Sequence, residues 1–350
     1  MIQRFLPPAS RGGAGYFTVG LCAALSARGH HVTIFSQDPA PPGAPFTVVQ
    51  LPGRTRRLAP LTFPMQIAGV DFRPFDVIHA QGDEQIVRHR GRPVVRTLHG
   101  SSLDEAAANG LRAMSPKHLL LHAWFYGGEL VAALRADAVV GVSRASVRHL
   151  PRGADVIPNG IDVAAFAPDG TPKSEAPSIL FVGELDSRKR GRWLAGEFAA
   201  RVRTRVPDAE LWLVSPDRAD GPGIVNMGTL DDAALRAAYR RAWVMCLPST
   251  YEGFGRPYAE ALAAGTAVAA SPNPGARDVL DDGRYGVIAP DDTLAAALVA
   301  LLTDTGRRTA LAAPGLARAR EYDWAHIAEA YERVYARVMQ RAGRGTRGAA

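Results

Sequence analysis

Residues 247–260, LPSTYEGFGRPYAE, bring two carboxylates, a glycine-containing loop and a predicted helix start into one short segment. A strand is predicted to end before the loop, and the proline after the second glycine is typical of a first helical turn. The amides of Phe254 and Gly255 then point outward at the positive end of the helix, where an anion or a hydroxyl group binds. Glu252 precedes the helix and Glu260 lies inside it, so we expect them to hold different parts of one ligand. The alternative is a pair of surface glutamates without a ligand.

The rest of the chain alternates short β-branched apolar runs with helix-like segments, which predicts an α/β fold with parallel, doubly wound sheets. Strands are predicted at residues 31–35, 76–79, 94–98 and 138–142 in the first half, and at 178–182, 209–214, 224–227, 244–247, 267–270 and 285–288 in the second. Helices are predicted at residues 16–28, 117–135, 192–205, 231–241, 256–264 and 293–303. Two Rossmann-like domains facing each other across a cleft place the carboxyl ends of both sheets around one site. Such sites bind nucleotides or phosphorylated ligands.

The domain boundary is predicted from turn residues. The chain of 350 residues is more than twice the modal domain size of about 150 residues, which favours two domains. A turn signal at residues 158–160 (PNG) and a proline-rich stretch at 167–177 mark the hinge. We expect one domain at residues 1–160, a second at 161–323, a helix at 324–340 that crosses back to the first domain, and a disordered tail at 341–350.

Most of the surplus positive charge lies in the first half of the chain. The net charge is +7, and residues 1–167 carry 17 basic and 11 acidic side chains against 24 and 23 in the remainder. Such a balance indicates nucleic acid, an anionic membrane or a phosphorylated substrate as partner. Nucleic-acid-binding surfaces typically combine basic residues with aromatic residues on which bases stack. No basic run of this chain has aromatic residues between its basic ones. We therefore expect no nucleic acid and favour a face turned toward an anionic lipid or a charged acceptor, with a merely solvated face as the alternative.

Cysteine usage and hydropathy suggest where the protein works. Cys22 and Cys246 lie far apart in apolar contexts, which predicts buried free thiols in a reducing compartment. The longest apolar runs, such as residues 294–302, fall short of the roughly 20 residues that a membrane span needs. Residues 1–6 lack the apolar core of a signal peptide. We expect a cytoplasmic protein, with peripheral contact at the inner face of the membrane left open.

Glu252 and Glu260, together with other short motifs along the chain, resemble the motifs of family 4 glycosyltransferases of the GT-B fold. In that family two glutamates are separated by seven residues. The resemblance covers nearly the whole chain. Its elements are Pro7-Pro8 with Gly12-Gly13, residues 28–32 (RGHHV), 76–79 (DVIH), 95–100 (VRTLHG), 142–143 (VS), 156–162 (VIPNGID) and 181–189 (FVGELDSRK). The resemblance implies a retaining, metal-independent enzyme that moves a hexose or N-acetylhexosamine from a nucleoside-diphosphate sugar to a hydroxyl of a small-molecule, lipid or glycan acceptor.

The resemblance implies roles for four residues of the second domain. Glu260 would hold the ribose hydroxyls of the nucleotide sugar, and Glu252 a sugar hydroxyl close to the reacting carbon. The amides of Phe254 and Gly255 would contact the sugar and the diphosphate. The donor therefore belongs to the second domain, and the acceptor to the basic first one.

Two further contacts are implied from the first domain. Gly13, with Gly12, would bring bare backbone against the diphosphate, where a Cβ would block the approach. His99 would contact the donor sugar beside the anomeric carbon. The alternative is that His99 is a histidine at a strand end that serves only the structure.

The first strand also departs from the family, because only residues 1–6 precede Pro7. Residues 2–6 then form the end of that strand, or the true start lies upstream.

The expected cation for the leaving diphosphate is Lys189, because a fixed positive charge there stabilises the transition state. The family usually places an arginine directly after the glycine of this loop, and this chain has Glu184 instead. Arg188 and Arg190 flank the lysine and are candidates for the missing charge. Glu184 then turns away or pairs with one of them.

No Asp-x-Asp pair stands at a predicted strand end, so we expect no metal ion and no cofactor. UDP-sugars are favoured as donors and GDP-mannose also fits, while the protein is expected to be a monomer or homodimer. Three alternatives stay open. They are a GT-B nucleotide-sugar epimerase, a noncatalytic basic nucleic-acid-binding protein, and an NAD enzyme. The last is disfavoured because Thr18 stands where the third glycine of the nucleotide fingerprint belongs.

Overall fold

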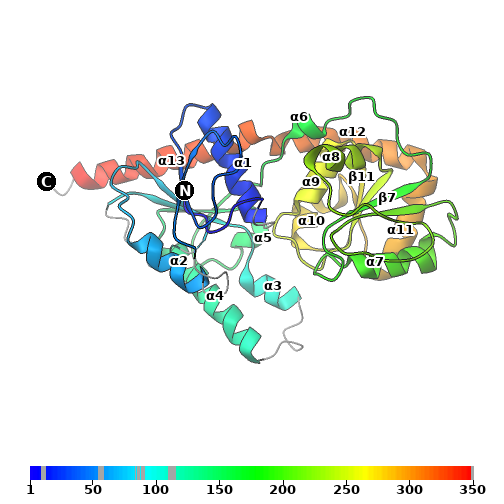
Figure 1. Cartoon of the computed structure of the whole chain (residues 1–350), viewed down its shortest axis with the longest axis horizontal. Coiled ribbons are helices and arrows are strands. Elements are labelled where there is room, and N and C mark those ends of the chain that lie inside the picture. Colours follow the sequence, from blue (N-terminus) through cyan, green and yellow to red (C-terminus); the bar gives the residue numbers. More distant parts are fainter. Residues whose placement is uncertain are drawn as a thin grey trace. The chain divides into compact units, whose positions relative to one another are not determined.

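The computed structural model describes residues 1–8, 13–53, 59–82, 84, 87, 91–108 and 116–347 (Figure 1). The chain divides into two compact units. Unit 1 contains residues 1–160 together with the last helix, α13 (Trp324–Arg347), and unit 2 contains Ile161–Asp323. Gly12 lies outside the described residues.

Unit 1 is built on parallel strands. They are β1 (Thr33–Ser36), β2 (Thr47–Gln50), β3 (Ile78–Ala80), β4 (Val94–Leu98), β5 (Ala138–Gly141) and β6 (Asp155–Val156). Ile2 bridges β1 through Phe35 and β3 through Ala80, which joins both groups into one sheet. Counted with Ile2 as the first strand, the order is 3-2-1-4-5-6-7, the Rossmann arrangement. The predicted strand contribution of residues 2–6 is therefore made at Ile2.

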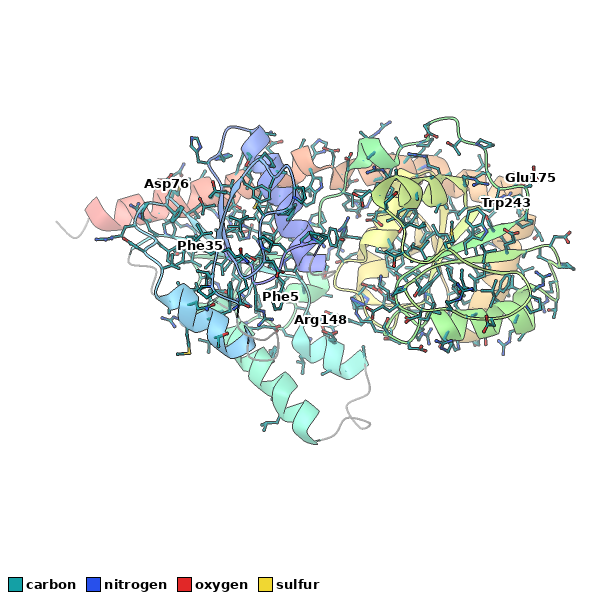
Figure 2. The ribbon with its side chains drawn as sticks, in the orientation of Figure 1. Phe5, Phe35, Asp76, Arg148, Glu175 and Trp243 are labelled. Atoms are coloured by element: carbon teal, nitrogen blue, oxygen red, sulfur yellow. The ribbon has the colours of Figure 1, made fainter. Side chains whose placement is uncertain are left out.

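Helices cover both faces of this sheet. Unit 1 contains α1 (Gly13–Ala27), α2 (Ala59–Ala68), α3 (Ser102–Ala108), α4 (Pro116–Arg135) and α5 (Arg144–Val147). One apolar cluster joins α1 and α13 to β4 and β5 through Phe17, Leu21, Tyr331, Val95 and Val140. A second cluster joins α2 and the end of α4 to the opposite face. There Phe35, which is labelled in Figure 2, packs edge-on against Phe72 and Phe75, with ring centroids 5.6 and 5.8 Å apart.

The end of the last helix differs from the prediction. α13 continues to Arg347, whereas the sequence placed its end at residue 340 and a disordered tail beyond. The glycines and arginines after residue 340 were interpreted as disorder. However, extending an existing helix costs far less than nucleating one, and the preceding turns of α13 are anchored on the sheet. The prediction of disorder is therefore wrong for residues 341–347.

Unit 2 repeats the strand arrangement. Its strands are β7 (Ser178–Val182), β8 (Glu210–Val214), β9 (Ile224–Asn226), β10 (Val244–Leu247), β11 (Ala267–Ala270) and β12 (Val287–Ile288). They pair in the order β12-β11-β10-β7-β8-β9, all parallel. The chain therefore reverses its direction of winding between β7 and β10. Loops that follow these two strands lie at the topological switch point, where open α/β sheets bind ligands.

The helices of unit 2 are α6 (Val163–Phe166), α7 (Gly191–Glu197), α8 (Asp232–Arg241), α9 (Arg256–Ala263), α10 (Pro274–Val279), α11 (Asp291–Thr303) and α12 (Thr305–Ala319). The helix predicted at 192–205 is α7 followed by a π-helical turn at Phe198–Val202. α12 was not predicted, because Gly306 and Pro314 read as helix breakers. Both cysteines are free and buried, as predicted.

Candidate active site

The loops after β7 and β10 come together at the switch point of unit 2. The amide of Thr250 donates a hydrogen bond to the carbonyl oxygen of Arg188 at 2.9 Å, which ties the two loops together. This contact places Arg188, Lys189 and Glu252 at one edge of the sheet. The sequence predicted each of these residues, but not the contact that joins their loops.

Glu252 is a buried carboxylate with only 5% of its surface exposed. It accepts a hydrogen bond from the Ser249 hydroxyl at 2.9 Å, and Arg188 forms an ion pair with it at 3.3 Å. A buried carboxylate needs such partners because desolvation of an unpaired charge costs several kcal/mol. Arg188 therefore neutralises and orients Glu252.

Lys189 lies folded across Gly183. Its ammonium group donates to the carbonyl oxygen of Val182 at 3.1 Å, at the carboxyl end of β7. A Cβ on Gly183 would lie 2.2 Å from Cδ of Lys189, and the φ of +150° there also favours glycine. An ammonium group has three N–H donors, and the Val182 carbonyl is the one acceptor that the described residues offer to it, so two donors are available to a ligand at this edge.

Arg190 has a different environment from its neighbours. Its guanidinium forms a bidentate ion pair with Asp291 at 2.6 Å and donates to the Pro248 carbonyl at 2.7 Å. It also stacks over Trp193, 4.2 Å from the ring centroid. These contacts hold the β7 loop to the start of α11 and do not favour the prediction that Arg190 supplies charge to a diphosphate. Glu184 is exposed to solvent.

The helix after the β10 loop begins at a left-handed residue. Gly255 is the N-cap of α9 with a φ of 85°, and a Cβ there would lie 2.4 Å from the Tyr258 ring. Phe254 is 4% exposed and packs edge-on against Tyr322. Because its side chain is buried, Phe254 has only its backbone to offer a ligand, and the contact of its amide with the donor stays a prediction.

Glu260 belongs to a separate group of contacts. It is 6% exposed, and its carboxylate oxygens accept from the Tyr239 hydroxyl at 2.9 Å and from Arg256 at 3.0 Å. Burial, followed by the charge of Glu260, raises the pKa of Tyr239 well above its ordinary value, so the phenol keeps its proton and donates it. The two glutamates have no partner in common among these contacts, which agrees with separate roles.

In unit 1, Gly13 is the first residue of α1 and is exposed. A Cβ on Gly13 would meet no atom of the described residues within 4 Å. Its predicted contact with a diphosphate stays a prediction.

His99 follows β4 at its carboxyl end. Its Nε2 lies 2.8 Å from Oε1 of Gln81, and its ring meets Phe17 edge-on at 5.0 Å. Burial, reinforced by the charge of Arg96, lowers the pKa of His99 to about 3, so the ring is neutral at physiological pH. The sequence motifs assign no role to Gln81. The structure instead turns it inward to His99 and His79.

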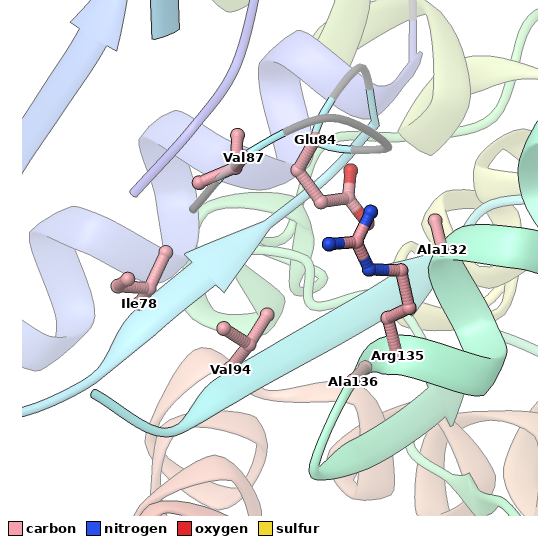
Figure 3. Close-up of a pocket in the computed structure, with 7 residues that line it drawn as sticks. All are labelled: Ile78, Glu84, Val87, Val94, Ala132, Arg135 and Ala136. Carbon is pink, nitrogen blue, oxygen red and sulfur yellow. The ribbon is translucent and has the colours of Figure 1, made fainter. Parts of the chain in front are cut away.

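The described part of unit 1 also contains a small hollow on the face of its sheet that α2 and the end of α4 cover (Figure 3). It is lined by Ile78, Glu84, Val87, Val94, Ala132, Arg135 and Ala136. Its volume of 10 Å³ admits about one water molecule. Unit 2 has an open hollow of 360 Å³ at the amino ends of β7 and β8, lined in part by Glu175 and Trp212. Neither hollow is at the carboxyl ends of the strands, where ligands of such sheets bind.

The described residues show neither a group of three or more potential metal ligands nor a helix long and apolar enough to cross a membrane.

Solved structures with this fold are glycosyltransferases of the GT-B class. Sucrose-phosphate synthase from Thermosynechococcus elongatus superposes with a TM-score of 0.82 at 23% identity, covering 97% of this chain and 98% of that one. WaaG, a glycosyltransferase involved in lipopolysaccharide biosynthesis, superposes with a TM-score of 0.74 at 17% identity, covering 95% and 98%. The fold therefore defines a two-domain GT-B protein.

The sequence comparisons identify the family. Residues 11–165 match the profile described as Glycosyltransferase Family 4, and residues 176–304 match Glycosyl transferases group 1. Phosphatidyl-myo-inositol mannosyltransferase of Mycobacterium tuberculosis (strain ATCC 25618 / H37Rv) is 29% identical over 93% of each chain. D-inositol 3-phosphate glycosyltransferase of Kineococcus radiotolerans is 32% identical over 61% of this chain and 60% of that protein. The chain belongs to the family 4 glycosyltransferases and is a glycosyltransferase.

Proposed function

We propose that this protein is a retaining, metal-independent mannosyltransferase that uses a nucleoside-diphosphate mannose and an inositol-containing lipid acceptor. One observation carries the transfer chemistry. The switch-point loops of unit 2 bring the Glu252 carboxylate, the Arg188 and Lys189 cations and the N-terminus of α9 to one edge of a sheet. The names of the relatives that span 93% of the chain support mannose and phosphatidylinositol. GDP-mannose is therefore the first donor to test, and the UDP-sugars favoured by the sequence come second.

In this mechanism, charge develops on the leaving diphosphate as the glycosidic bond breaks. The Lys189 ammonium, with two N–H donors that bind no acceptor of the described residues, and the amide groups at the start of α9 stabilise that charge. Because these groups are fixed before the reaction, they stabilise the transition state more than the ground state. The leaving phosphate removes the proton of the acceptor hydroxyl, which attacks from the same face and retains the anomeric configuration.

The roles of the other residues follow the family pattern. Glu252 holds a hydroxyl of the sugar, Glu260 holds the ribose, and His99 contacts the sugar from unit 1. Arg188 acts through Glu252, to which it is already paired. These positive groups belong to the chain itself, which supports a reaction that needs no divalent ion.

Unit 1 has features that suit a lipid acceptor. Met65 of α2 and Leu120 and Leu134 of α4 are 69%, 73% and 54% exposed. Both helices lie on the side of unit 1 opposite α1 and α13 (Figure 1). Exposed apolar side chains on a basic domain bind anionic membrane surfaces. We expect the protein to sediment with phosphatidylinositol vesicles but not with phosphatidylcholine vesicles, and Leu120→Glu to lower the bound fraction.

The deciding experiment is a transfer assay with purified protein. GDP-mannose and UDP-sugars are each incubated with phosphatidylinositol vesicles, with and without EDTA, and the products are analysed by mass spectrometry and NMR. We expect mannosyl phosphatidylinositol in the α configuration, with no loss of rate in EDTA. An inverted product or a rate abolished by EDTA contradicts the mechanism. Donor conversion without any acceptor indicates the epimerase alternative.

A further inference from the structure

A row of buried polar side chains connects α13 with His99 inside unit 1. Residues at alternate positions of a strand share one face of the sheet, and this row occupies the face covered by α1 and α13. Polar groups buried among apolar residues cost free energy unless they are hydrogen-bonded. The members are Tyr331, Tyr335, Thr97, His79, Gln81 and His99, of which the first five are at most 8% exposed.

The first half of the row fixes the tautomer of His79. Burial lowers the pKa of His79 well below its ordinary value, so the ring is neutral and carries one hydrogen. Its Nε2 lies 3.1 Å from the amide nitrogen of Gln81 and 2.7 Å from the Thr97 hydroxyl. An amide nitrogen only donates, so Nε2 of His79 accepts. The ring hydrogen is therefore on Nδ1, which donates to the Tyr335 hydroxyl at 2.7 Å.

The orientation of the Gln81 amide decides the second half. Its nitrogen lies 3.9 Å from Sδ of Met1 and donates to this sulfur. Sulfur is a weak acceptor, so this position suits the NH₂ group and disfavours the oxygen. With the nitrogen turned to Met1 and His79, the oxygen faces Nε2 of His99 at 2.8 Å. An amide oxygen only accepts, so Nε2 of His99 carries the ring hydrogen.

We propose that Gln81 is a positioning residue that holds His99 in the tautomer protonated at Nε2, so that Nδ1 accepts a hydrogen bond from a hydroxyl of the donor sugar. Nδ1 of His99 is buried and has no hydrogen-bond partner among the described residues, so it is an unsatisfied acceptor. A neutral acceptor atom binds a hydroxyl group and disfavours a carboxylate. The identity of the ligand rests on the proposed function, whereas the tautomer does not.

The tautomer is measured without any activity. Protein labelled with ¹⁵N-histidine is studied at pH 7.5 by long-range ¹H–¹⁵N correlation, and His99→Asn assigns the signal. We expect wild-type His99 to be protonated at Nε2 and Gln81→Leu to give a mixture of tautomers. A wild-type His99 protonated at Nδ1, or a tautomer that Gln81→Leu leaves unchanged, overturns the proposal. The wild-type measurement decides even if the variant does not fold.

Kinetics supply a second test. Gln81→Leu lowers kcat/KM about tenfold, as the loss of one oriented hydrogen bond implies. Gln81→Glu retains an acceptor for Nε2–H, so activity is recovered at higher pH. Its negative charge favours the protonated ring, in which Nδ1 can no longer accept, so the acidic loss of activity moves to higher pH.

Gln37→Leu is the matched control, because Gln37 is also a buried glutamine of unit 1 but is bonded to Gln66. We expect its kcat/KM to equal that of wild type. If Gln81→Leu and Gln37→Leu have equal kinetics, or if Gln81→Glu leaves the pH profile unshifted, Gln81 does not position His99. If the wild type transfers no sugar from any donor, the proposed function fails, while the tautomer measurement still decides on Gln81.

Discussion

The two units hold their candidate site residues in different ways. In unit 2 several partners are close in the sequence: Lys189 lies across Gly183, Ser249 donates to Glu252, and Arg256 pairs with Glu260. Arg188 and Glu252, which are 64 residues apart, join two of these loops. In unit 1 the partners are distant. Gln81 and His99 are 18 residues apart, and His79 and Tyr335 are 256 residues apart. Unit 2 therefore builds its site from short motifs that a few long-range contacts join, and unit 1 builds its site from the packing of α13.

This difference explains which residues a motif can reveal. A loop that returns on itself needs particular residues at fixed spacing, and that spacing is visible in the sequence. A row of hydrogen bonds across a sheet needs only polar side chains on the correct face, and many sequences have them by chance. The structure of unit 1 therefore adds functional residues that the sequence did not assign, whereas the structure of unit 2 mainly adds partners.

The largest effect is expected when the packing of α13 is removed. Tyr331 is fully buried, and its hydroxyl is hydrogen-bonded to that of Thr97 at 2.9 Å. Tyr331→Ala should lower the free energy of unfolding by about 3–5 kcal/mol, as truncation of a buried aromatic does. Hydrogen exchange should show lost protection in β3–β5 and unchanged protection in β7–β12. Tyr16→Ala, at a tyrosine that is 40% exposed, is the control and should change stability little. Equal loss of protection in both units would mean that α13 does not act on unit 1 alone.

Lys189→Ala should remove charge stabilisation in unit 2 without loosening the fold. We expect kcat to fall by about 10²–10³-fold, the usual cost of removing one fixed donor to a developing negative charge. Thermal unfolding and hydrogen exchange should stay close to wild type. Arg192→Ala removes a nearby cation that is 52% exposed and paired with Asp186, and should leave the rate unchanged. A near-normal rate in Lys189→Ala refutes its assignment.

Glu252→Ala should lower kcat by about a hundredfold, because a sugar hydroxyl near the reacting carbon loses its acceptor. The substitution also removes the ion-pair partner of the Arg188 guanidinium, which stays as a cation at the site. Binding of the donor diphosphate is therefore expected to change less than turnover. Glu175→Ala removes an exposed glutamate at the opposite edge of the sheet (Figure 2) and is the control. If both variants turn over substrate equally, Glu252 has no part in the reaction.

The last comparison is a loss of stability in acid that is confined to unit 1. Burial lowers the pKa of His99 to about 3 and that of His79 well below its ordinary value. Below a pH of about 6.5 these histidines bind protons in the unfolded chain but not in the folded one. The free energy of unfolding is therefore highest above that pH and falls as the pH drops. The slope reaches about 1.4 kcal/mol per pH unit for each histidine.

Unit 2 contains no histidine, which makes it an internal control. Urea unfolding between pH 7 and pH 4.5, followed by hydrogen exchange in each unit, measures the slope. His79→Gln should reduce the slope of unit 1 by the contribution of one histidine. If both units lose the same stability in acid, the loss comes from carboxylates and not from the histidines.

Most of the fold is predictable from the sequence because alternating apolar runs and turn residues are local signals. The strands at 94–98, 178–182 and 244–247 are found where they were predicted. β2, with its mostly exposed residues, has no such signal, and α12 was hidden by Gly306 and Pro314. The end of α13 was misjudged because helix propagation does not need a favourable composition at every residue.

The sequence by itself determined the family, the two Rossmann-like halves and the motif residues Lys189, Glu252 and Glu260, because their spacing is a local property of strand ends and helix starts. Only the tertiary structure decided which charges are already paired. It assigned Arg190 to Asp291 and Arg188 to Glu252. It also decided that His99 is neutral and faces Gln81, because burial and hydrogen-bond direction arise only when distant segments pack together.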